Sequence, residues 1–223
     1  MFPHCLAPIR PAPRARAARV AATLGVWLGC VGQPLAHAED VMVRICFDYA
    51  CAHEAQARFD DAVLSKTARW LGGARDAADE RARLAHAVAW LYVEAGRQTP
   101  IWRDRGGNRN DNTDLPGAMD CLDHAANTTA FLHLLGVRGL LRFHYVAAPV
   151  QRVRWYGAEH WSARVVETAS SEEYAVDTWY FDPGIPAAVM PLQAWRDGEV
   201  PVAGAPLAND LQLREAATWW GKQ

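Results

Sequence analysis

The chain has 223 residues, of which 51% are hydrophobic and 22% are charged, and its formal net charge at pH 7 is −2. A balanced, mildly acidic charge argues against a protein that binds nucleic acid through a strongly basic surface. The length suits one domain with a sizeable core, and the sequence contains no internal repeat and no second domain.

The N-terminal stretch has the three parts of a secretory signal peptide. A basic region without acidic residues precedes an apolar run over residues 20–31, and small residues then lead to the motif A-H-A at residues 36–38. The arginines of the basic region are Arg10, Arg14, Arg16 and Arg19. The apolar run is short for a membrane span, so a permanent anchor is the weaker interpretation. We expect a signal peptide over residues 1–38, cleavage after Ala38 and a secreted, periplasmic protein.

Two alternatives remain for this stretch. One is a disordered tail rich in alanine, arginine and proline, and the other is a lipid-anchored N-terminus at Cys30. After cleavage of the signal peptide, the folded part is a single domain over residues 39–223.

The cysteines suggest one disulfide and one unpaired thiol. Export favours disulfides, and Cys46 and Cys51 are close enough in the sequence to pair. Cys121 is then the odd thiol, which calls for an explanation in an exported protein. Cys121 is either a buried apolar residue or a nucleophile.

The first half of the domain is predicted to be mainly helical. Residues 42–47 form a strand or a disulfide-closed lead-in, and a helix follows over residues 52–71 with Gly72-Gly73 as its stop. A second helix is predicted over residues 76–95. The polar, glycine-containing stretch 103–116 is a long loop, and its position just before Cys121 favours a functional role.

The second half begins with a helix that Cys121 opens and that stops near Gly136. Asp120 is its predicted N-cap, and Asp123 resembles the partner in a capping box. The hydrophobic period then changes to that of strands. We expect strands over residues 140–146 (ending before Pro149), 159–167 and 174–181, turns at 169–173 and 182–184, and helical stretches at 192–195 and 211–220.

The order of these elements places three chemically active residues together. Cys121 lies at a helix start, where unpaired N–H groups favour a thiolate, and an imidazolium at His160 would favour it further. Asp177, on the next strand, can fix the tautomer of His160. If the turn between the strands has an even number of residues, both side chains share a sheet face. Asp120 and Asp123 oppose the thiolate, unless their carboxylates point away, are neutralised or hold a cation.

The remaining parts of the site are less specific. The oxyanion would be held by the backbone N–H of Cys121 and one further donor, for which Trp102, Asn108 and Asn110 are candidates. Trp161 and Trp179 either shield the histidine–aspartate pair from water or belong to the core.

At three stretches the chain resembles the transglutaminase-like branch of papain-fold proteins. These are M-D-C-L-D-H at residues 119–124, E-H-W-S at 159–162 and V-D-T-W at 176–179, and the likeness covers roughly residues 85–185 in topology. The resemblance implies an α+β fold of N-terminal helices packed on an antiparallel sheet, with Cys121, His160 and Asp177 as the catalytic triad. Within the family, the chain looks most like bacterial periplasmic transglutaminase-like cysteine proteinases.

That group acts on cell-surface adhesins and binds calcium through acidic residues beside the cysteine. The resemblance therefore implies a thiol protease that acts on a protein or peptide of the cell envelope. No cofactor is required, and calcium is possible on Asp120 and Asp123. The chain departs from the group at Leu122, where an acidic residue is typical, although the acidic loop 104–114 is close in the sequence.

Three other functions remain open at this point. The same triad can pass the acyl group to an amine instead of water, as a transglutaminase does, because both reactions begin with one thioester. Cys121 and His124 can instead be metal ligands on one helix face, completed by His133, His144 or His160. The fold can also be a non-catalytic binding domain whose ten tryptophans contact a peptide or glycan.

Overall fold

The structure is a computed structural model that describes residues 40–107, 115–154 and 157–204. Within these residues, helices and antiparallel strands are mixed, which agrees with the predicted α+β class. The expected signal peptide and the helical stretch 211–220 lie outside the described residues. None of the described helices has the length and apolar character needed to cross a membrane.

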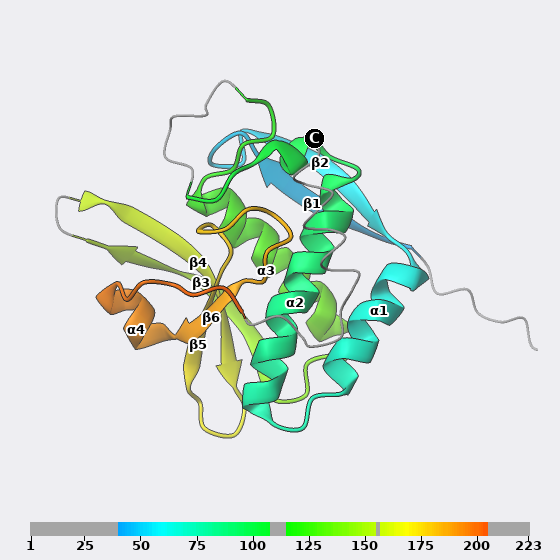
Figure 1. The fold of residues 1–223 in the computed structure, drawn as a ribbon, viewed down its shortest axis with the longest axis vertical. Coiled ribbons are helices and arrows are strands. Elements are labelled where there is room, and N and C mark those ends of the chain that lie inside the picture. Colours follow the sequence, from blue (N-terminus) through cyan, green and yellow to red (C-terminus); the bar gives the residue numbers. More distant parts are fainter. Residues whose placement is uncertain (1–39, 108–114, 155–156, 205–223) are drawn as a thin grey trace, which may run out of the picture. The chain divides into compact units, whose positions relative to one another are not determined.

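The elements are named here in chain order and can be followed in Figure 1. They are β1 (Val41–Phe47), β2 (His53–Phe59), α1 (Asp61–Gly72), α2 (Ala77–Gly96), the 3-10 helix η1 (Pro100–Arg103), α3 (Cys121–Val137), β3 (His144–Val153), β4 (Glu159–Glu167), β5 (Glu173–Asp177), β6 (Ala188–Pro191) and α4 (Leu192–Asp197).

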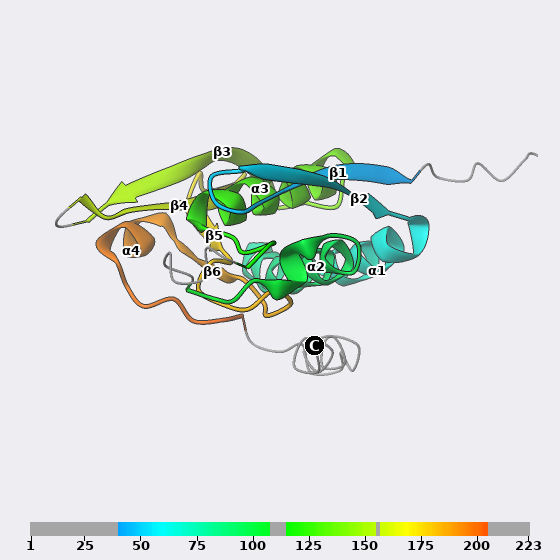
Figure 2. The same ribbon diagram turned by 90° about the horizontal axis from the view of Figure 1, so that it is seen from above.

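The strands form two antiparallel sheets that meet on one helix. β1 and β2 make a two-stranded hairpin, and the other sheet has the order β3-β4-β5-β6. Helix α3 contacts β1, β3, β4 and β5, and it also packs against α2 (Figure 2). The helix that begins with Cys121 is therefore fixed against both sheets.

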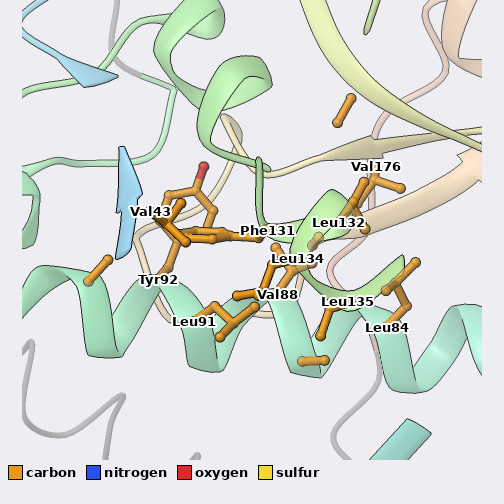
Figure 3. Close-up of a cluster of buried hydrophobic side chains, with 14 of the residues drawn as sticks. Val43, Leu84, Val88, Leu91, Tyr92, Phe131, Leu132, Leu134, Leu135 and Val176 are labelled. Atoms are coloured by element: carbon orange, nitrogen blue, oxygen red, sulfur yellow. The ribbon is translucent and has the colours of Figure 1, made fainter. Parts of the chain in front are cut away.

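The main hydrophobic core lies where α2, α3 and the sheets meet (Figure 3). Its members come from most of the elements, so it connects the helices to both sheets. Large side chains at its centre include Leu84, Leu91, Tyr92, Phe131, Leu132 and Leu135, each with 2% exposure or less.

Aspartate caps begin all three long helices, as their side-chain chemistry predicts. Asp60 accepts a hydrogen bond from the N–H of Val63, and Asp76 caps α2 in the same way. Asp120 caps α3, and the reciprocal bonds of a capping box are present with Asp123. The predicted cap, the capping box and the predicted start of α3 at Cys121 are confirmed.

The helix predicted over residues 52–71 is wrong in its first half. Residues 53–59 form β2, which pairs with β1 from Val41↔Phe59 to Phe47↔His53, and the helix begins only at Asp61. The cause is the turn at residues 48–51, which the Cys46–Cys51 disulfide closes. This turn reverses the chain, so that residues 53–59 pair with β1. Phe59 fits the helical spacing, but it is a buried strand residue.

The strand boundaries also differ from the prediction. β3 does not end before Pro149, because it is an edge strand in which an irregularity between Ala147 and Val150 accommodates the proline. β5 ends at Asp177 instead of residue 181, and β6 was not predicted. Strand β4 has the predicted bounds.

Candidate active site

Cys121 is the first residue of α3 and is half-buried. Among the described cysteines it is the free one, because Cys46 and Cys51 form a disulfide. The pairing that the sequence allowed is therefore present. The position of Cys121 places its thiol at the positive end of a helix dipole, as expected from the sequence.

His160 and Asp177 form a buried hydrogen-bonded pair. Nε2 of His160 lies 2.7 Å from Oδ2 of Asp177, and the two residues are 7% and 1% exposed. The β4–β5 hairpin explains the contact, since Ala163 pairs with Val176 and the ladder puts Asp177 opposite Ser162, two positions from His160 on the same face. The even-numbered turn that the pairing required is present, because the N–H of Glu167 bonds to the carbonyl of Glu172.

Three aromatic rings surround the imidazole of His160. The ring centroids of Trp179, Tyr180 and Trp195 lie 4.9, 5.3 and 5.7 Å from it. Trp195 also donates its indole N–H to Oδ2 of Asp177 at 2.8 Å. Trp179 is buried and its ring contacts the imidazole, so its position agrees with both expected roles, shielding and core packing. Trp195 was not predicted, because nothing in the local sequence marks this residue as a partner of Asp177.

The surroundings of the Cys121 thiol raise its pKa above the usual value. Burial is the main cause, and the charges of Asp120 and Asp177 add to it. The backbone N–H groups of Trp161 and of Cys121 itself act in the opposite direction. Trp161 follows His160 on β4, and α3, which begins with Cys121, packs against that strand. A thiol with a raised pKa needs a base before it can act as a nucleophile.

The carboxylates of Asp120 and Asp123 are occupied by backbone N–H groups. The N–H groups of Tyr49 and Cys51 donate to Asp123 at 2.9 and 2.6 Å, and that of Ala50 donates to Asp120 at 3.1 Å. Both carboxylates thus bind the disulfide-closed turn to the start of α3. Burial raises the pKa of Asp123 to about 6, and the charge of Asp120 adds to this, against the opposing hydrogen bonds.

The expected calcium ligands, Asp120 and Asp123, thus lie together. Asp123 also lies within 4.8 Å of the sulfur atoms of Cys46 and Cys51, but sulfur in a disulfide is not a thiolate ligand. Calcium binding at these carboxylates stays a prediction.

The oxyanion candidates have different positions. Trp102 lies in η1 and packs against Val93, beside Arg103. Asn108 and Asn110 fall outside the described residues. The segment that precedes this gap is anchored near the site, because Gly107 donates its N–H to the carbonyl of Trp179 at 2.6 Å. The second oxyanion donor stays a prediction.

A buried arginine that was not predicted lies beside the pair, on the neighbouring strand. Arg152 lies directly opposite His160 in the β3–β4 ladder. Its guanidinium donates to the carbonyl of Trp195 and to the hydroxyl of Tyr180, and it lies 4.6 Å from the Trp195 ring. Arg152 thus holds two of the three rings that enclose His160.

Comparisons of the chain with protein-family models, with curated proteins and with solved structures gave no significant match.

Proposed function

We propose that this protein is an exported cysteine-dependent hydrolase of the transglutaminase-like, papain-fold class. Its substrate is a protein or peptide of the cell envelope, in which it cleaves a peptide or amide bond. Cys121 is the nucleophile, His160 the general base and acid, and Asp177 the residue that orients the imidazole.

The observation that carries this proposal is the buried His160–Asp177 pair on β4 and β5, two strands that pack against α3, together with a free thiol at the start of α3. Asp177 bonds to Nε2 of His160, which leaves Nδ1 as the nitrogen able to take a proton. The aromatic enclosure keeps water from the pair, and this strengthens its electrostatic interaction.

The proposed reaction has two halves. His160 takes the proton of the Cys121 thiol, the sulfur bonds to the substrate carbonyl carbon, and the backbone N–H of Cys121 stabilises the oxyanion. The C–N bond then breaks, and the imidazolium gives its proton to the leaving amine. Water, deprotonated by His160, hydrolyses the thioester and restores the thiol.

Transfer of the acyl group to an amine is the alternative, because it shares the first half of this reaction. A non-catalytic or metal-binding envelope protein that retains the fold is a further alternative. The buried His160–Asp177 pair, whose carboxylate also accepts the indole N–H of Trp195, argues for catalysis.

The test is the alkylation of Cys121 by iodoacetamide, followed by peptide mass across a range of pH. We expect selective reaction near neutral pH, loss of the labelled peptide in Cys121→Ser, and a decrease of about 100-fold at pH 7 in His160→Ala. Because burial raises the thiol pKa, the His160→Ala protein should react only as the pH becomes alkaline.

The control variant is His133→Ala, since His133 lies on the same helix with an exposed side chain and should leave the rate unchanged. Labelling that is slow, alkaline and indifferent to the loss of His160 would contradict the proposal.

A further inference from the structure

A second buried aspartate–histidine pair lies behind the candidate active site. Nε2 of His124 lies 2.9 Å from Oδ2 of Asp104, and the two residues are 2% and 0% exposed. His124 is on α3, three residues after Cys121. The sequence left open that His124 is a metal ligand together with Cys121. In the structure, both ring nitrogens of His124 form hydrogen bonds within the protein, to Asp104 and to Thr178.

This pair connects three segments of the active site. The other oxygen of Asp104 accepts the N–H of Met119 at 2.7 Å, two residues before the nucleophile. Nδ1 of His124 lies 2.9 Å from the hydroxyl of Thr178, the residue that follows Asp177. One pair of side chains thus joins the approach to Cys121, the helix that carries it and the end of the strand that carries Asp177.

The hydrogen bonds continue beyond Thr178 and close on the same helix. The hydroxyl of Thr128 lies 3.0 Å from those of Thr178 and Tyr92, and Tyr92 donates to the carbonyl of His124 at 3.2 Å. A fully bonded network in a buried environment holds its members in one arrangement. Its geometry is therefore well suited to fix the position of α3 relative to the end of β5.

Stability alone is a weak explanation for this network. Buried ionisable pairs can often be replaced by apolar side chains of similar volume without loss of stability. Precise alignment is a better explanation, since a displacement of about 1 Å can lower a reaction rate by about 100-fold.

We propose that Asp104 and His124 are positioning residues, which hold the first turn of α3 against the end of β5 and thereby align Cys121 with His160. This inference rests on the proposed function, because it assigns the network a role in that reaction. Neither residue contacts the substrate or the reacting atoms.

The test compares His124→Gln with a matched variant at a distant pair of the same kind. Glu80 and His144 are buried, and Oε1 of Glu80 lies 2.8 Å from Nδ1 of His144, so His144→Gln removes a similar bond between α2 and β3. Iodoacetamide alkylation of Cys121 at pH 7 and urea unfolding are measured on both purified proteins. We expect a decrease in alkylation rate of about 10-fold or more in His124→Gln and less than about 2-fold in His144→Gln.

Thr178 gives a second pair of variants in case His124→Gln does not fold. Thr178→Val removes the hydroxyl and keeps the shape, whereas Thr178→Ser keeps the hydroxyl. We expect slower alkylation of Cys121 in Thr178→Val than in the unmodified protein, and a rate close to that of the unmodified protein in Thr178→Ser.

The outcomes separate this inference from the proposed function. If His124→Gln and His144→Gln slow alkylation equally, or if His124→Gln has no effect while His160→Ala does, the positioning role is wrong and the triad stands. If the unmodified protein and His160→Ala are alkylated at the same rate, the proposed function is wrong, and the positioning role is wrong with it.

Discussion

At the scale of single residues, the surroundings of Asp177 define the site most sharply. This buried carboxylate accepts hydrogen bonds from His160, from the indole of Trp195 and from the backbone N–H of Trp179 at 3.1 Å. Buried carboxylates are costly without such partners. The indole N–H of Trp195 fixes the oxygen that faces His160, so it should influence the orientation of the imidazole.

The substitution Trp195→Phe tests this role, since it removes the N–H donor and keeps an aromatic ring near His160. We expect about a 10-fold slower alkylation of Cys121 at pH 7, and a loss of about 1 kcal/mol in the free energy of unfolding. Trp90→Phe is the control, because the Trp90 indole nitrogen is buried without a hydrogen-bond partner. Equal rates in Trp195→Phe and the unmodified protein would show that the donor is dispensable.

At the scale of elements, the turn between β1 and β2 is the unusual feature. Residues 48–51 all have positive φ angles, of 63°, 68°, 52° and 56°, and none of them is glycine. Each such residue costs about 1–2 kcal/mol. The Cys46–Cys51 disulfide offsets this cost, together with the hydrogen bonds that backbone N–H groups of the turn donate to the carboxylates of Asp120 and Asp123. The turn and the start of α3 therefore stabilise each other.

Removal of the disulfide should therefore weaken the start of α3. For Cys46→Ala combined with Cys51→Ala, we expect a loss of about 2 kcal/mol in the free energy of unfolding, measured in urea. Reduction of the unmodified protein with dithiothreitol should lower its stability by a similar amount. A double variant as stable as the unmodified protein would show that the hydrogen bonds to Asp120 and Asp123 hold the turn alone.

The same turn shows which elements the sequence could predict. The cap of α3 and the bounds of β4 depend on local chemistry, and they were predicted. None of the four residues of the left-handed turn is glycine, and the Asp120 and Asp123 carboxylates that help to stabilise it are distant in the sequence. Without that turn, β2 could not be recognised as the partner of β1.

At the scale of the whole molecule, the candidate site depends on contacts between distant parts of the chain. The shared face of His160 and Asp177 followed from one hairpin, so the sequence could predict it. Trp195 and Asp104 reach the site only through the tertiary fold, and no spacing in the sequence marks them. Residues that lie in one hairpin or at one helix start could thus be predicted, whereas residues that only the tertiary fold brings to the site could not.

A buried, hydrogen-bonded glutamate–histidine pair outside the active site joins α2 to the start of β3. Glu80 accepts hydrogen bonds from His144 and from the backbone N–H groups of Arg142 and Phe143. Burial alone would raise the pKa of Glu80, but these hydrogen bonds outweigh it and hold the pKa below the usual 4.5. A carboxyl group whose pKa is lower in the folded state stabilises the fold above its unfolded pKa. Its contribution is lost as the pH falls below 4.5 and through the lower folded value.

The substitution Glu80→Gln should therefore reduce stability in a pH-dependent way. We expect a loss of about 3 kcal/mol in the free energy of unfolding at pH 7, measured in urea. The difference from the unmodified protein should shrink as the pH falls below 4.5, because protonation of Glu80 then weakens the same contacts. Glu54→Gln is the control, since its ion pair with Arg44 is exposed and should contribute less than about 1 kcal/mol. A difference that stays constant between pH 7 and pH 3 would show that Glu80 stabilises the fold by shape and hydrogen bonding, without its charge.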